Sequence, residues 1–166
     1  MLLFGFFSNA QDIGVSNVIL VEGTLDTSVS SVTYDLCATN PITLNIVLEN
    51  FSSTSDTVSK VTLGITGVNS TVRTEFTISS TITLSGNSST TVTYPDDFSD
   101  GTAINFSNYG RSTITVSSTS VSATGDLDTD NDAFYIVGNV YVPDTPTLNV
   151  INGTACQGEA ITFEIA

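Results

Sequence analysis

The residues best suited to chemistry in this sequence are four aspartates spaced two residues apart: Asp126, Asp128, Asp130 and Asp132. Carboxylates in this spacing can converge on one hard cation, and Ca²⁺ takes roughly six to eight oxygen ligands. The run does not fit an EF-hand, because Asn131 stands where that loop needs glycine and Val137 where it needs glutamate. We therefore expect either a looser Ca²⁺ site, completed by Asp144 or a second domain, or an acidic turn selected for turn geometry and charge.

Groups for catalysis are scarce. The chain has no histidine, which excludes Ser-His-Asp and Cys-His mechanisms and removes a common zinc ligand. A glycosidase needs only two carboxylates, but the chain has no tryptophan. Four tyrosines fall at scattered strand positions where core or edge packing explains them: Tyr34, Tyr94, Tyr109 and Tyr141. We expect no enzymatic activity.

Two cysteines, Cys37 and Cys156, lie far apart in the sequence. They can pair in an oxidising compartment only if the fold brings their Cα atoms within bridging distance. We do not expect this pairing, because Cys156 belongs to the next predicted domain. Without a histidine to activate it, neither thiol is expected to act as a nucleophile.

The charge balance excludes two classes of partner. Three basic residues face seventeen acidic ones, for a formal net charge of −14. Nucleic-acid binding needs a cationic surface that displaces phosphate counterions, and anionic membranes repel a strongly acidic protein. We therefore expect neither nucleic-acid binding nor membrane insertion.

The hydrophobic pattern is that of β-structure. Apolar residues alternate with polar ones almost throughout, and no helical period is present. Strands are expected at residues 13–20 (with an irregularity in the middle), 29–36, 42–49, 61–65, 72–78, 82–84, 90–94, from 114 onward and at 133–142. The last strand is apolar on both faces, which indicates a central position or cover on both sides. Seven to nine short strands with turns between them predict an all-β, immunoglobulin-like antiparallel β-sandwich.

The chain divides into four predicted parts. Residues 1–10 combine a short apolar run with small residues and resemble the remnant of a secretory signal peptide, the alternative being a hydrophobic first strand. Residues 11–142 form the sandwich. Residues 143–147 contain two prolines and are expected to be a linker. Residues 148–166 begin a second, truncated Ig-like domain.

Three stretches resemble CARDB-type, Ig-like modules related to cell adhesion: residues 42–50 (ITLNIVLEN), 84–92 (LSGNSSTTV) and 130–133 (DNDA). Residues 154–163 (TACQGEAITF) are similar to the opening of Ig-like repeats in large Bacteroidota surface proteins, such as gliding-motility adhesins exported by type IX secretion. The resemblance implies neighbouring Ig-like domains of the same polypeptide as partners, with surface or secretion-system proteins as further candidates. It also implies that Cys156 pairs with a cysteine beyond Ala166.

Besides the disulfide of Cys156, the sequence suggests a second covalent modification, the attachment of sugar. Asp56, Thr57 and Val58 match a short O-glycosylation consensus of Bacteroidota secreted proteins, and Thr57 is expected on a surface loop. A chance match is the alternative in a chain this rich in threonine. The sequence Asn-x-Ser/Thr, which marks N-glycosylation in other secreted proteins, begins at Asn50, Asn69, Asn87, Asn105 and Asn152.

The leading hypothesis is a non-enzymatic structural or binding module, near the N-terminus of an extracellular bacterial cell-surface adhesin. Two alternatives stay open. One is a subunit of an extracellular filament that donates a strand to its neighbour. The other is an accessory domain of a secreted polysaccharide-degrading enzyme.

Overall fold

The computed structural model describes residues 12–37, 41–67, 73–76, 78–99, 101, 103–106, 108–120 and 130–141. Every regular element in these ranges is a β-strand, as the sequence predicts. No helix in these ranges is long and apolar enough to cross a membrane. The predicted signal remnant (1–10), linker (143–147) and second domain (148–166) lie outside the described residues.

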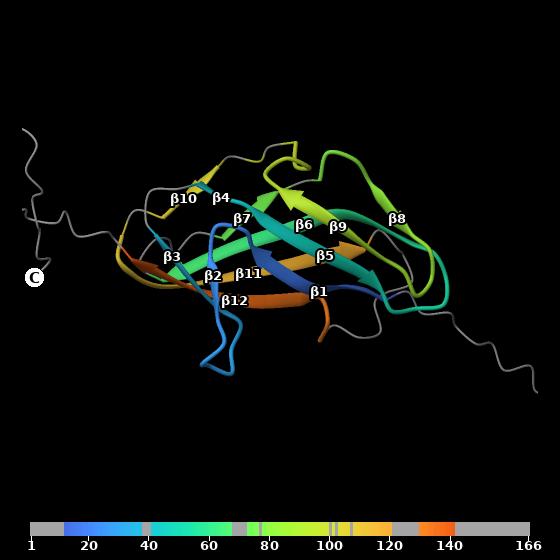
Figure 1. The fold of residues 1–166 in the computed structure, drawn as a ribbon. Helices are drawn as coiled ribbons and strands as arrows, with labels where there is room; N and C mark the ends of the chain where they lie inside the picture. The colour runs from blue at the N-terminus through green and yellow to red at the C-terminus, as the bar shows by residue number, and fades with distance from the viewer. Residues whose placement is uncertain are drawn as a thin grey trace, which may run out of the picture.

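Two β-sheets of different size face each other (Figure 1). The smaller sheet has the order β1-β5-β9, from β1 (Ile13–Leu20), β5 (Leu44–Asn50) and β9 (Ser89–Tyr94). A short separate pair joins β4 (Pro41–Ile42) to β10 (Ile104–Asn105).

The larger sheet has the order β2-β3-β12-β11-β6-β7, and β8 also pairs with β6. Its strands are β2 (Thr24–Asp26), β3 (Thr33–Cys37), β6 (Asp56–Gly67), β7 (Arg73–Phe76), β8 (Ile82–Leu84), β11 (Gly110–Ser120) and β12 (Ala133–Tyr141). All its pairs are antiparallel except β3 with β12, which is parallel. The strands are divided between the two sheets as in immunoglobulin sandwiches. Strands β1, β5 and β9 correspond to A, B and E, and strands β6, β11 and β12 correspond to C, F and G.

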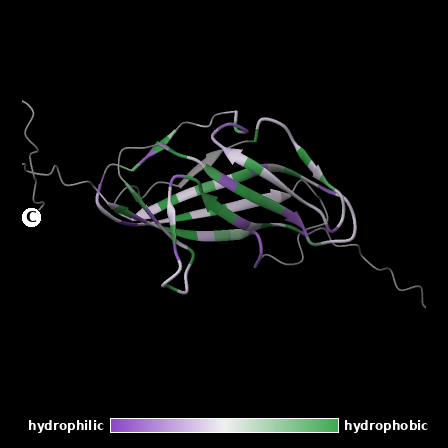
Figure 2. Ribbon diagram, viewed as in Figure 1, coloured by the Kyte–Doolittle hydropathy of each residue, from purple (hydrophilic) through white to green (hydrophobic). Residues whose placement is uncertain are grey.

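Alternate residues of both sheets point inward and form one hydrophobic core. Figure 2 shows hydrophobic residues, in green, along the strands of both sheets. In β5 the predicted inward set Leu44, Ile46 and Leu48 is at most 1% exposed. The opposing sheet contributes Ile114 and Val116 of β11, both fully buried. Burying side chains of this size is worth about 1.5–3 kcal/mol each before the entropy cost of ordering them.

Two bulges keep the apolar residues on the inner face. In β1 the pairing with β5 skips one residue between Val15 and Asn17. Because of this extra residue, Ile13 and Val15 before the bulge and Val18 and Leu20 after it all face the core. This is the irregularity predicted for the first strand. In β6 a similar shift lies between Val58 and Lys60, opposite Ser120 and Thr119.

Strand β12 lies between β3 and β11, so its predicted central position is confirmed. Ile136 is fully buried on the inner face, and Val137 is largely covered on the outer face by its neighbours. Tyr135, however, is 62% exposed, so the outer face of this strand is covered only in part.

Element boundaries were predicted less well. The second predicted strand is β3, which begins at Thr33 rather than at residue 29, and Val29 is exposed in the preceding turn. The turn expected at residues 52–57 is shorter, because β6 begins at Asp56. The described residues contain twelve strands rather than seven to nine, because strands of two or three residues, such as β2, β4 and β10, are too short to show a period of their own.

Asn50 ends β5 as a fully buried polar residue. Its Nδ2 donates to the carbonyls of Thr54 (2.7 Å) and Leu84 (3.1 Å). Its Oδ1 accepts from the backbone N–H (3.0 Å) and the hydroxyl (2.8 Å) of Ser52. The side chain therefore holds the 51–55 loop and the end of β8 to the sandwich, and its burial leaves no room for a glycan in the folded protein.

Replacing Asn50 with alanine is expected to lower the free energy of unfolding by about 2–4 kcal/mol, because the buried carbonyl of Leu84 and the backbone N–H of Ser52 lose their side-chain partner. Urea denaturation measures the change. The control is Asn105→Ala, at an exposed position of β10, which should change stability by less than about 0.5 kcal/mol. Equal effects of the two substitutions would contradict the role of Asn50.

Candidate functional site

The outer face of the larger sheet carries a row of polar side chains near the end of β12. Strand pairing places Thr24 opposite Asp35, Asp35 opposite Asn139, and Asn139 opposite Arg111. These residues face outward, because their neighbours Leu36 and Val140 point into the core. Four strands thus bring a hydroxyl, a carboxylate, an amide and a guanidinium together.

Two residue pairs further on, and therefore on the same face, the parallel register places Tyr141 opposite Cys37. The Tyr141 ring also meets the ring of Tyr109 edge to face, with centroids 6.1 Å apart and planes at 64°. Tyr141 is 46% exposed and Tyr109 68% exposed. Core or edge packing was the predicted reason for these two tyrosines, and this prediction is wrong; it holds for Tyr34 and Tyr94, which are buried.

Asp35 connects the polar row to the aromatic pair. It accepts a hydrogen bond from Nδ2 of Asn139 at 3.1 Å. Its negative charge is the main reason that the pKa of Tyr141 is raised; partial desolvation and a hydrogen bond from the phenol to Asp35 act in the same direction. Asp35 therefore orients the Asn139 amide by a hydrogen bond and acts on the Tyr141 phenol mainly through its charge.

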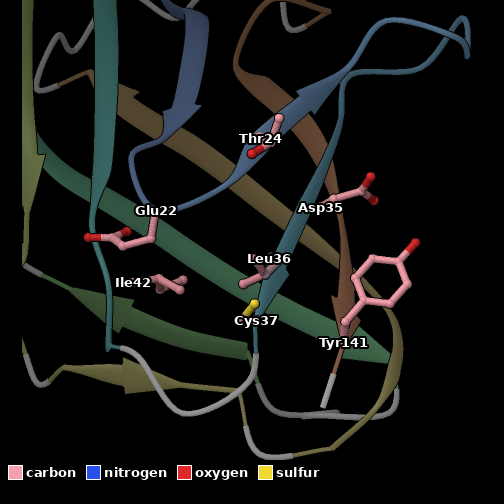
Figure 3. A pocket seen from close by; sticks show the side chains of 7 residues that line it. All are labelled: Glu22, Thr24, Asp35, Leu36, Cys37, Ile42 and Tyr141. Atoms are coloured by element: carbon pink, nitrogen blue, oxygen red, sulfur yellow. The ribbon is translucent and has the colours of Figure 1, made fainter. Parts of the chain in front are cut away.

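Two hollows flank Tyr141. The first has a volume of about 300 Å³ and is lined by Glu22, Thr24, Asp35, Leu36, Cys37, Ile42 and Tyr141. Figure 3 shows Asp35 and Tyr141 on one side of this hollow and Glu22 with Ile42 on the other. The second has a volume of about 230 Å³ and is lined by Tyr109, Gly110, Arg111, Asn139, Val140 and Tyr141.

Glu22 is held in place within the first hollow. One of its carboxylate oxygens accepts the backbone N–H of Thr43 at 2.6 Å. Beneath the polar groups, Leu36 and Ile42 form an apolar floor, since both are almost fully buried. The arrangement can bind a small ligand that has both apolar faces and hydroxyl groups. The sequence missed it, because these residues are neighbours only through strand pairing.

Solved structures support the fold. The CARDB domain of a Pyrococcus furiosus protein, crystallised in complex with di-metal ions, aligns with a TM-score of 0.53 at 12% identity, over 81% of this chain and 97% of that chain. The chain has a CARDB-like, immunoglobulin-like fold. A β-glucosidase from Listeria innocua in complex with glucose aligns at a TM-score of 0.36 and 15% identity, over 80% of this chain and 16% of that chain, too low a likeness for any conclusion. No family model matches the chain, and no curated protein matches it significantly.

The acidic turn of this CARDB-like sandwich is described only in part, since Asp126 and Asp128 lie outside the described residues. Between Asp130 and Asp132, Asn131 accepts the N–H of Val15 at 2.9 Å through its carbonyl, and its Nδ2 donates to Asp12 at 2.6 Å. A Cβ on Gly14 would collide with the Asn131 backbone, so the turn lies directly against β1. Within the described ranges, no group of three or more His, Cys, Asp or Glu side chains is placed to hold a metal ion.

The structure describes Thr57 and Cys37, two residues considered for modification. Thr57 lies within β6 and not on a loop, and its hydroxyl shares a 2.9 Å hydrogen bond with the hydroxyl of Thr83 on β8. Its glycosylation stays a prediction. Cys37 is an exposed free thiol at the rim of the first hollow. Cys156 lies outside the described residues, so its disulfide with a more distant cysteine also stays a prediction.

Replacing Asp35 with asparagine is expected to lower the pKa of Tyr141 toward the ordinary value of a phenol, because the main cause of its rise is removed. Tyrosinate absorbance, recorded against pH, measures the shift, and Tyr141→Phe identifies the step that belongs to Tyr141. Since the folded-state pKa is the higher one, the contribution of Tyr141 to stability is present below its ordinary pKa and is lost as the pH rises through the folded value. An unchanged titration in Asp35→Asn would show that Asp35 does not act on this phenol.

The calcium prediction for the acidic turn can be tested by thermal unfolding. If the turn binds Ca²⁺, added calcium raises Tm by mass action, and the double substitution Asp130→Asn with Asp132→Asn removes that rise. The control Asp96→Asn, at an exposed acidic residue of another turn, keeps it. The same small rise in all three proteins would favour an acidic turn without a specific ion.

Proposed function

We propose that this chain is a non-enzymatic structural and binding module of a secreted bacterial adhesin, located at the cell surface. In this proposal, residues 1–10 are the remnant of a signal peptide. Further Ig-like domains of the same polypeptide follow the linker at residues 143–147 and are the main partners of the module. The CARDB-like fold supports a structural role.

The observation that carries the proposal is the position of the first and last strands of the sandwich. The start of β1 lies beside the start of β12, because the N–H of Val15 bonds to the carbonyl of Asn131. Strand β12 then runs nine residues to Tyr141, a rise of about 30 Å. The chain therefore enters at one end of the sandwich and leaves at the opposite end (Figure 1). Modules with this geometry can be joined end to end into an extended array without reversing the chain.

The edge of β9 favours such an array over strand exchange at that position. Both outward backbone groups of Thr93 are already used by Asp97. The Thr93 N–H donates to the Asp97 carboxylate at 2.7 Å, and the Asp97 N–H donates to the Thr93 carbonyl at 2.8 Å. Strand exchange needs free backbone groups along an edge, and natural sheets often block exposed edges in this way.

The proposal is tested on protein isolated from its native cells. We expect surface labelling of intact cells to modify it while a cytoplasmic marker stays unlabelled. We also expect a mature N-terminus at Gln11 and an intact mass well above 17.4 kDa. A chain of about 17.4 kDa that keeps residues 2–7 would contradict the adhesin and favour the filament subunit.

A further inference from the structure

We propose that the two hollows beside Tyr141 form a binding site for a short neutral oligosaccharide, whose sugar rings pack against Tyr141 and Tyr109. The inference goes beyond the proposed function, because a module that only spaces its neighbours needs no ligand of its own. It also stands apart from the adhesin proposal, since the site consists entirely of described residues of this sandwich.

The distribution of tyrosines is the first argument. The chain has five, and Tyr34 and Tyr94 are buried in the core. The other three are exposed, and Tyr135 and Tyr141 face outward from the same strand. Tyr109 contacts Tyr141, so two large rings meet on the surface beside both hollows. Grouped aromatic surface that stays exposed on a soluble protein is a common mark of a binding site.

The second argument is that the site is preorganised. Asp35 accepts a hydrogen bond from the Asn139 amide, and the backbone N–H of Thr43 donates to the Glu22 carboxylate. Side chains that are fixed before binding lose little rotamer entropy when a ligand arrives. An edge-to-face contact with Tyr109 restrains the Tyr141 ring further.

The third argument is chemical. A pyranose ring has a face of polarised C–H groups, which suits the negative face of an aromatic ring, and hydroxyl groups at its edge. Those hydroxyls can donate to the carboxylates of Glu22 and Asp35 and accept from Arg111, whose guanidinium forms several bonds at once. The exposed ring therefore suits the C–H face of a sugar, and the planar polar side chains around it suit the hydroxyl groups at the sugar's edge.

Charge and volume narrow the ligand class. A formal charge of −14, with two carboxylates in the first hollow, disfavours uronic acids and sulfated sugars, so the sugar should be neutral. The volumes of about 300 and 230 Å³ each suit about one sugar ring and its hydroxyls. Because the hollows share Tyr141, we infer that a chain of at least two rings occupies both.

The test is NMR titration of the 166-residue chain with cellohexaose, mannohexaose and chitohexaose, with oligogalacturonate as the anionic comparison. We expect at least one neutral hexasaccharide to bind and to shift the signals of Tyr141, Tyr109 and Asn139, while the anionic sugar binds more weakly. Tyr141→Ala should weaken binding about tenfold or more, because it removes the ring shared by both hollows. Tyr141→Phe keeps the ring and should retain most of the affinity.

The matched control is Tyr135→Ala. Tyr135 is also exposed on the outer face of β12, but it lies six residues, or about 20 Å, from Tyr141 and lines neither hollow. Its replacement should leave affinity unchanged, and the melting temperature of each variant shows whether it is folded. The proposal is overturned if no neutral sugar binds at millimolar concentration, or if Tyr141→Ala and Tyr135→Ala weaken binding equally. Either result leaves the adhesin proposal standing, since that depends on mass, N-terminus and surface labelling.

Discussion

The parallel pairing of β3 with β12 is the constraint on which the candidate site depends. It joins Asp35 to Asn139, which are 104 positions apart in the chain, and it places Cys37 opposite Tyr141. A one-residue slip of β3 would turn Asp35 toward the core and bring Leu36 to the surface, which the hydrophobic core opposes. The register that buries the core therefore also assembles the site.

Apolar residues stay on the inner face along β1 and β6 because each strand has a bulge where the alternation of its sequence shifts by one residue. Without the extra residue in the middle of β1, either Ile13 and Val15 or Val18 and Leu20 would face solvent. The same bulged strand brings the backbone of Val15 to the carbonyl of Asn131, and Gly14 leaves room for that approach. Asn131 therefore attaches the acidic turn to the sandwich. The spacing of the aspartates does not predict this role of Asn131.

Local sequence was enough to predict the sandwich but not the site. Alternation identified β5, a run that is apolar on both faces identified β12, and the break in alternation identified the bulge of β1, because side-chain period and burial are local properties. Short strands such as β4 and β10 exist only through their pairing and leave no local period. The same is true of Tyr109 and Tyr141: their contact comes from the pairing of β11 with β12, so their positions in sequence gave no sign of it.

Two asparagines show why one part of the molecule specifies the fold while another can accept a ligand. The Asn50 amide makes four hydrogen bonds in a dry interior, so each of its groups is committed and any other conformation leaves buried partners unsatisfied. The Asn139 amide makes a 3.1 Å bond to Asp35 at the surface, which orients it without using all its capacity. The remaining hydrogen-bonding capacity of Asn139 faces water beside the exposed rings of Tyr109 and Tyr141. A ligand that replaces this water gains hydrogen bonds in a fixed geometry, whereas nothing can be gained at Asn50 without first unfolding the loop that it holds.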